Sequence, residues 1–430
     1  MKPKLQVALD FLNLDRAIKV AEESVAGGVD WIEIGTPLIK SEGLNAVREI
    51  KKRFSKHKIV ADMKVMDTGR YEVEAAAKAG ADIVVLLGVA DDSTMKDAIK
   101  ASKNYGCELM VDLMNVENME KRAIELEAMG VDYICIHVGI DQQMRGMDPI
   151  SELKKISGSV KIPLAIAGGI NSETAPIAVD SGASIIIVGG AINKSEDAKK
   201  ATEIIKKAIE KGKPIKTKLY KKYRDPLKIL KRVSTANISD AMHRSGHMEG
   251  IKPVSGIDTV ERVAGKAVTV RTYPGDWAKT VEAIDVAEKG DIIVIDSGGT
   301  GKAVWGELAS WSCKRKGISA VIIDGATRDL EDIRKMKFPV FAREVKPTAG
   351  EPKGFGEINV PIKCGNVPLQ PGDYIIGDLD GVVVIPKEKA VEIANRALDV
   401  FEKENRIRKE IKKGSTLSRV LKIKKWERER

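Results

Sequence analysis

Apolar, β-branched runs recur at regular intervals through the first half of the chain and alternate with segments of helical period. Between the runs, apolar residues return every three or four positions, which predicts amphipathic helices at residues 15–26, 71–79 and 119–129. The strand-like runs are residues 5–10, 31–35, 58–64, 81–88, 107–113, 131–139, 163–169 and 183–190. Eight strand–helix repeats predict a closed (β/α)₈ TIM barrel, and a doubly wound open sheet is the less favoured alternative.

The pattern changes after a short basic segment that contains Gly212 and Pro214. Helical period is expected at residues 277–288 and 303–316, and the expected strands are residues 265–272, 291–296, 320–324, 340–342, 374–377 and 381–385. This mixture predicts an α/β layered domain. We therefore divide the chain into a barrel (1–211), a basic linker (212–224), a mixed α/β domain (225–395) and a charged C-terminal helix or tail (396–430).

Composition narrows the classes of partner. The chain of 430 residues has a net charge of +10, concentrated in residues 206–222 and after Phe401. Such basic segments suit nucleic acid, but only 4% of residues are aromatic, so base-stacking platforms are scarce and solvated surfaces are the favoured interpretation. No apolar run reaches the ~18 residues of a membrane span. The four cysteines show no Cys-x-x-Cys spacing. We expect a cytoplasmic protein without a signal peptide, membrane segment or disulfide framework.

Six charged or titratable residues stand at the ends of five of the expected strands or just beyond them. In a TIM barrel these strand ends form the rim that carries the active site. The residues are Asp10, Glu33, Asp62, Lys64, Asp112 and His137. On an extended strand Asp62 and Lys64 point to one face, since side chains alternate, and Asp67 follows where the chain turns. Solvated strand ends explain one or two such residues, but a functional rim explains all of them better.

The last two expected strands of the barrel end in paired glycines. Gly168-Gly169 follows the seventh strand, and Gly189-Gly190 follows the eighth. Glycines let backbone N–H groups approach an anion closely, and the loops after strands seven and eight are the usual phosphate site of this fold. The sequence therefore predicts a phosphorylated substrate.

The motif Asp62-x-Lys64-x-x-Asp67 on the third strand resembles the orotidine 5′-phosphate decarboxylase superfamily, and within it the 3-hexulose-6-phosphate synthases. Similar motifs surround Asp10, Glu33 and His137, and the resemblance covers about residues 1–210. It implies a lyase that joins ribulose 5-phosphate and formaldehyde reversibly in an aldol reaction that gives hexulose 6-phosphate. It also implies Mg²⁺ (or Mn²⁺), bound by Glu33 and Asp62.

The resemblance implies a role for each remaining rim residue. Lys64 would stabilise charge beside the metal, Asp67 would reach the site of a partner subunit in a barrel dimer, and His137 would carry a proton. Asp10 and Asp112 would bind substrate hydroxyls, and the paired glycines would hold the phosphate. The related keto-gulonate-phosphate decarboxylases, which are the alternative, typically carry arginine where this chain has Ile140.

The second half has its own candidate site. Gly306-Glu307 precedes Arg328-Asp329 with the spacing found in the family of regulator of ribonuclease activity A and the 4-hydroxy-4-methyl-2-oxoglutarate aldolases, which residues 230–390 resemble. In the aldolase branch the resemblance implies a second divalent metal on Asp329, supported through water by Glu307. Arg328 and the amides of Leu308 and Ala309 would hold a pyruvyl carboxylate.

Three roles stay open for the second half: a retro-aldolase on an oxo-acid, a ribonuclease-binding module, or a scaffold that sets assembly. The family implies a trimer or hexamer for this domain. For the whole chain, the rival to an enzyme is a non-enzymatic regulator that binds RNA or a ribonuclease through its basic segments.

Overall fold

The computed structural model describes residues 2–217, 225–257, 262–421 and 423. Two compact units divide the chain. The first comprises residues 1–222 and 402–430, and the second comprises residues 223–401. Part of the predicted basic linker, residues 218–224, and the tail residues 422 and 424–430 lie outside the described residues.

Within its described residues, the first unit contains eight parallel strands that close into a barrel, as predicted. The strands are β1 (Lys4–Leu9), β2 (Trp31–Ile34), β3 (Lys58–Val65), β4 (Ile83–Leu87), β5 (Glu108–Asp112), β6 (Tyr133–His137), β7 (Leu164–Ala167) and β8 (Ile185–Val188). Closure is direct, because β1 pairs with β8 in the register Lys4↔Ile185. The open-sheet alternative is therefore wrong.

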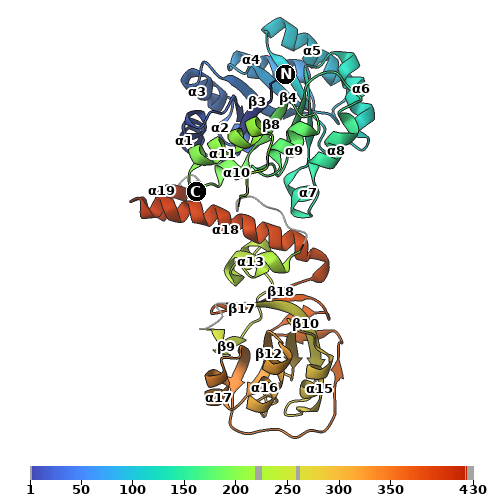
Figure 1. Cartoon of the computed structure of the whole chain (residues 1–430), viewed down its shortest axis with the longest axis vertical. Helices are drawn as coiled ribbons and strands as arrows, with labels where there is room; N and C mark the ends of the chain where they lie inside the picture. The colour runs from blue at the N-terminus through green and yellow to red at the C-terminus, as the bar shows by residue number, and fades with distance from the viewer. Residues whose placement is uncertain (1, 218–224, 258–261, 422, 424–430) are drawn as a thin grey trace, which may run out of the picture. The chain divides into compact units, whose positions relative to one another are not determined.

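Helices lie on the outside of this ring of strands (Figure 1). They are α1 (Leu14–Ala26), α2 (Thr36–Glu42), α3 (Asn45–Arg53), α4 (Gly69–Lys78), α5 (Asp92–Tyr105), α6 (Met119–Met129), α7 (Ile140–Met144), α8 (Pro149–Ile156), α9 (Ala175–Asp180), α10 (Gly190–Asn193) and α11 (Ala198–Lys211). Side-chain caps begin several of them, such as Asn13 for α1 and Asp91 for α5. Their apolar stripes and the outward side chains of the strands form the larger core, and inward side chains fill the barrel.

The second unit is built on one mixed sheet, in agreement with the predicted α/β layered domain. Its path is β18–β17–β10–β11–β12–β13–β9, with β14 beside β10, and β15 and β16 form a separate pair. The strands are β9 (Lys252–Ser255), β10 (Val263–Arg271), β11 (Ile292–Asp296), β12 (Ala320–Thr327), β13 (Val340–Val345), β14 (Glu357–Ile358), β15 (Ile362–Cys364), β16 (Val367–Leu369), β17 (Tyr374–Asp378) and β18 (Gly381–Ile385). From β10 to β13 neighbouring strands are parallel.

Helices cover this sheet, and one of them begins later in the chain than predicted. The helices are α12 (Leu227–Leu230), α13 (Thr235–Ala241), α15 (Ala278–Val286), α16 (Glu307–Lys316) and α17 (Leu330–Met336). A helix was expected from residue 303, but α16 begins at Glu307. The preceding residues are extended, because Ala303 bridges Ala349 and Trp305 bridges Thr327.

The charged C-terminal segment forms α18 (Ala390–Lys412), followed by α19 (Leu417–Leu421). Residues from Glu402 onward belong to the first unit. None of the helices in the described ranges has the length and apolar character that crossing a bilayer requires.

Candidate active site

The carboxyl ends of the barrel strands surround an open cavity of about 320 Å³. Five of the six predicted rim residues line it, and Asp112 lies beneath them, almost fully buried. Both glycine pairs also line the cavity. The lining set includes Asp10, Glu33, Asp62, Lys64, His137, Gly168, Gly169, Gly189 and Gly190. The fold thus brings together residues from β1, β2, β3 and β6 and from the loops after β7 and β8.

The end of β3 is irregular where it delivers Lys64. The pairing of β3 with β4 shifts register between Ala61 and Val65. Lys64 has φ 51°, a left-handed conformation that is rare for a residue with a side chain. The Lys64 ammonium donates to both oxygens of Asp62, at 2.8 and 2.9 Å. Simple alternation predicted that these two side chains point to one face, and they do contact each other, but from a strand whose register shifts between them and the neighbouring strand. Strained backbone of this kind is typical of functional sites.

Asp112 joins Lys64 to His137. One oxygen of Asp112 accepts from the Lys64 ammonium at 2.7 Å and lies 2.7 Å from Nδ1 of His137. Burial alone would raise the pKa of Asp112, but His137 and Lys64 outweigh burial and hold that pKa well below its ordinary value. An ionised Asp112 orients the imidazole through Nδ1–H, so Nε2 is the nitrogen that can exchange a proton with the cavity.

Lys64 stays charged in this setting. Burial opposes the ammonium form, but the neighbouring carboxylates of Asp62 and Asp112 raise the pKa of Lys64 above its ordinary value. The cavity therefore contains a fixed positive charge beside its acidic residues.

The acidic residues of the cavity repel one another. Asp10 contacts solvent in the open cavity, yet protein atoms crowd its carboxyl group, and this desolvation and the charge of Asp62 raise its pKa to about 6. The pKa of Glu33 is raised well above its ordinary value by burial and then by Asp62 and Asp10. A cation placed among these groups would relieve the repulsion.

The predicted metal ligands of the barrel are Glu33 and Asp62. Among the described residues, no three His, Cys, Asp or Glu side chains form a group able to hold a metal ion. Mg²⁺ does not require three protein ligands, because it is commonly bound by one or two carboxylates and keeps water or substrate oxygens in its other coordination positions. Glu33 and Asp62 are buried carboxylates that both line the cavity and repel each other, so they fit that limited role.

Two supporting residues escaped the sequence analysis. The side-chain amide of Gln6 donates to Glu33 at 2.5 Å, and the hydroxyl of Thr36 donates to Asp62 at 2.8 Å. Gln6 is fully buried, and its neighbours Leu5 and Val7 in β1 are apolar. The sequence signal that could have identified Gln6 was a polar residue at an inward position of β1. For Thr36 the only such signal was its position directly after β2.

The paired glycines adopt backbone conformations, or lie so close to neighbouring atoms, that a larger residue would fit poorly. Gly168 and Gly169 have φ of 103° and 76°, and a Cβ on Gly168 would lie 2.4 Å from the carbonyl oxygen of Val138. A Cβ on Gly189 would lie 3.0 Å from Asp10. The positive φ favours glycine at residues 168 and 169, and the amides of such glycine loops are suited to binding an anion.

Asp67 lies outside the lining of this cavity. It is exposed, and its carboxylate accepts from the backbone N–H of Thr68 at 2.7 Å. Two apolar or aromatic residues near it in the chain, Met66 and Tyr71, are 51% and 70% exposed. Its predicted role in a partner's site stays a prediction.

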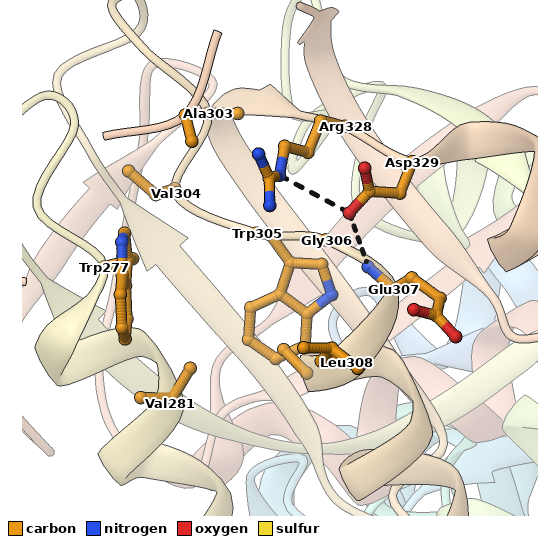
Figure 2. Close-up of a pocket in the computed structure, with 12 residues that line it drawn as sticks. Trp277, Val281, Ala303, Val304, Trp305, Gly306, Glu307, Leu308, Arg328 and Asp329 are labelled. Carbon is orange, nitrogen blue, oxygen red and sulfur yellow. Dashed lines mark hydrogen bonds and ion pairs between the residues drawn. The ribbon is translucent and has the colours of Figure 1, made fainter. Parts of the chain in front are cut away.

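A second pocket, of about 180 Å³, lies in the second unit. Figure 2 shows Arg328 and Asp329 on one side of it, with Trp277 and Val281 on the other. Asp329 forms an ion pair with Arg328, in which Nε and Oδ2 lie 3.4 Å apart, and its carboxylate accepts from the backbone N–H of Glu307 at 3.2 Å.

The five residues predicted for the second half all line this pocket: Glu307, Leu308, Ala309, Arg328 and Asp329. The side chain of Glu307 turns away from the carboxylate of Asp329 (Figure 2). A carboxylate, a guanidinium and backbone amides at the start of α16 are thus collected at one opening.

A closed barrel with paired acids, a lysine and a histidine at the carboxyl ends of its strands is an enzyme architecture. Residues 3–205 match the family described as orotidine 5′-phosphate decarboxylase / HUMPS, and residues 235–384 match the family described as Aldolase/RraA. The chain belongs to the orotidine 5′-phosphate decarboxylase / HUMPS family. Both predicted family resemblances are confirmed.

Individual relatives agree with the match in the barrel. The 3-hexulose-6-phosphate synthase of Bacillus subtilis (strain 168) is 43% identical over 210 residues, which are 49% of this chain and 100% of that protein. The synthase of Staphylococcus epidermidis (strain RP62A) is 41% identical over 48% of this chain and 99% of its own length. A solved structure of the Salmonella typhimurium synthase is 36% identical, with a TM-score of 0.47, and covers 49% of this chain and 99% of its own. The two curated relatives show that the barrel is that of a lyase with an aldolase-type function.

Proposed function

We propose that the barrel catalyses the reversible, Mg²⁺- or Mn²⁺-dependent aldol condensation of D-ribulose 5-phosphate with formaldehyde, giving D-arabino-hex-3-ulose 6-phosphate. The observation that carries this proposal is the hydrogen-bonded group of Asp62, Lys64, Asp112 and His137 at the cavity. It combines a fixed positive charge with an oriented imidazole. The relatives that share this half over their full length are named for the same product.

The reaction needs a base at C1 of the pentulose and stabilisation of the charge that results. Nε2 of His137 would take the C1 proton, and the electron pair would move to the C2 oxygen as the enediolate forms. The ammonium of Lys64 stabilises that negative charge. C1 then attacks formaldehyde, and the new oxyanion takes a proton from the imidazolium, which restores neutral His137.

Other groups would hold the substrate in place. Asp10 would accept hydrogen bonds from sugar hydroxyls, and the amides of the two glycine loops would bind the phosphate. Asp112, for which the same role was predicted, is outside the cavity lining, and its carboxylate already accepts from Lys64 and the backbone N–H of Met114 and contacts His137. It would therefore position Lys64 and His137 instead. A divalent cation held by Glu33 and Asp62 would supply further charge stabilisation for the sugar oxygens. Asp67 would complete the site of a partner subunit in a barrel dimer.

Decarboxylation of a keto-gulonate phosphate is the alternative in the same superfamily. The position at which those decarboxylases typically carry arginine is Ile140, which is 57% exposed and lines the cavity. An apolar side chain there cannot supply the positive charge that an arginine would bring to the reaction. We therefore favour the aldol reaction.

A formaldehyde assay on the full chain tests the proposal. Mixing the protein with ribulose 5-phosphate, formaldehyde and Mg²⁺ should consume formaldehyde, and adding a chelator should stop the consumption. Hexulose 6-phosphate alone should release formaldehyde. If neither direction proceeds in metal-replete protein, the proposed function is wrong. The same samples incubated with 3-keto-gulonate 6-phosphate would show release of carbon dioxide if the alternative holds.

For the second half we propose a retro-aldolase that releases pyruvate from an oxo-acid, with a divalent metal on Asp329. The observation that favours this role is the convergence of Arg328, Asp329 and the α16 amides on one pocket. Release of pyruvate from a hydroxy-oxoglutarate tests it directly, and oxaloacetate tests the same pyruvate enolate, which forms there with loss of carbon dioxide. A protein that releases none, but retains a ribonuclease on a column, would be a ribonuclease-binding module. One that does neither, and loses its oligomeric order when cut near residue 215, would contain a scaffold.

We also propose that the protein acts in the cytoplasm as a homo-oligomer, with barrel dimers and a trimeric or hexameric second domain. Binding of RNA through the basic segments is less favoured. It would weaken steeply with salt if it occurred, because it would rest on phosphate contacts.

A further inference from the structure

One arginine of α18 is buried in the first unit. Arg406 is 5% exposed, although the residues around it in the chain are mostly charged. A guanidinium is costly to remove from water unless its N–H groups find acceptors. The Nη1 group of Arg406 donates to the backbone carbonyls of Asn193 and Ser195, at 2.9 and 3.0 Å. Its Nε lies 3.4 Å from Glu410.

The carbonyls that Arg406 binds end the loop after β8. Asn193 is the last residue of α10, a single turn that starts at Gly190. The last carbonyls of a helix lack partners within the helix and favour a positive charge. Lys409 adds a third contact, because its ammonium donates to the carbonyl of Glu196 at 2.7 Å. Two cations of α18 thus hold the backbone on this side of the loop.

The other side of the same loop is attached to β1. The side-chain amide of Asn193 donates to the carbonyl of Ala8 at 2.7 Å, in a fully buried contact. Ala8 lies two residues before Asp10, and Gly189 approaches Asp10 so closely that a Cβ would lie 3.0 Å from its carboxylate. Residues 189–195 are therefore held between the end of β1 and Arg406.

We propose that Arg406 is a positioning residue that sets the glycine loop after β8 for the phosphate of the substrate. This inference rests on the proposed function, in which the amides of Gly189 and Gly190 bind that phosphate. Arg406 lies outside residues 3–205, which match the barrel family. The chain thus supplies support for its phosphate site from a segment far beyond the barrel sequence.

The position of Arg406 predicts a selective kinetic effect. Loss of the guanidinium frees the carbonyls of Asn193 and Ser195 and lets the loop shift. Phosphate binding should weaken, whereas the β3, β5 and β6 residues that perform the chemistry should keep their places. A side chain that only stabilised the fold would lower the unfolding temperature without changing the KM for one substrate alone.

The test compares three variants of the full chain. Arg406→Ala should raise the KM for ribulose 5-phosphate by about tenfold, with kcat and the KM for formaldehyde changed by less than about twofold. Arg406→Lys keeps the charge with one donor group and should fall between this variant and wild type. Arg408→Ala is the matched control, because Arg408 is exposed on the same helix and its ion pair with Glu404 spans 3.9 Å. It should match wild type.

Two further measurements separate the possible failures. Inorganic phosphate should raise the unfolding temperature of wild type and of Arg408→Ala. It should raise the unfolding temperature of Arg406→Ala by less, since a ligand that binds more weakly stabilises the folded state less. Added guanidinium ion should partly restore the KM of Arg406→Ala. Equal KM values and equal phosphate shifts in the two alanine variants would overturn the inference. If wild type shows no aldol activity, the proposed function fails instead, and the phosphate shifts still decide the role of Arg406.

Discussion

The two pockets of this chain contain similar residue types in different physical settings. In the barrel, the side chains of Lys64 and Asp112 are 17% and 2% exposed and lie 2.7 Å apart. In the second unit, the side chains of Arg328 and Asp329 are 43% and 36% exposed and lie 3.4 Å apart. Charges interact more strongly where water is excluded. The barrel site is therefore preorganised, whereas the pair in the second pocket is weakly held until a ligand or metal binds.

The largest effect should come from the barrel. Asp62→Asn keeps the shape of the side chain but removes the charge that binds Lys64 and would bind the metal. We expect formaldehyde consumption to fall by about 10²–10³-fold, as when one preorganised electrostatic contact is lost. Steady-state assays with saturating Mg²⁺ measure it. The exposed Asp97→Asn is the matched control, and a variant at Asp62 with wild-type kcat would show that the cavity is not the active site.

Asp112 should contribute strongly to stability. Asp112→Asn leaves Lys64 without one of its buried partners, and breaking such a pair costs about 3 kcal/mol or more. The pKa of Asp112 is lower in the folded state, so its contribution is fully present above the ordinary pKa of about 4 and is lost as pH falls below it. Urea unfolding at pH 7 and at pH 4 and below should show a gap between variant and wild type that narrows with acid. A constant gap would contradict the assignment.

In the second pocket we expect a smaller effect. Arg328→Ala should lower pyruvate release from oxaloacetate by about tenfold through a higher KM, because a charged hydrogen bond to a carboxylate contributes about 1.5–3 kcal/mol and the exposed site moderates it. Stability should hardly change, since the pair is solvated. The same variant should consume formaldehyde at the wild-type rate, and a parallel loss of both activities would remove the distinction between the two pockets.

We expect the smallest effect on the KM for ribulose 5-phosphate from alanine substitutions at Gly168 and Gly169, and the two substitutions should differ in size. A Cβ at Gly169 would lie 3.5 Å from the nearest side-chain atom, so Gly169→Ala meets only the strain of its φ of 76°, roughly 1 kcal/mol. Gly168→Ala would also bring a Cβ within 2.4 Å of the carbonyl oxygen of Val138. We expect the KM for ribulose 5-phosphate to rise in both and more at Gly168. The reverse order would place the phosphate elsewhere.

Much of the fold could be predicted from local pattern. The period of two or 3.6 residues is a property of neighbouring positions, so the eight barrel strands were located to within a few residues. The residues at the strand ends then predicted which side chains surround the cavity, because parallel strands in a barrel all end on one side. The start of α16 was missed because Ala303 and Trp305 bridge to residues distant in the chain.

The sequence by itself determined the repeat, the charged strand ends and the glycine pairs, since each of these depends on residues close together in the chain. Only the tertiary structure decided how Lys64 turns through a left-handed bulge to meet Asp62, and how Asp112 joins it to His137. It also decided that Arg406 binds a carbonyl 213 residues earlier. Contacts at such separations depend on chain closure and packing, which leave no local pattern in the sequence.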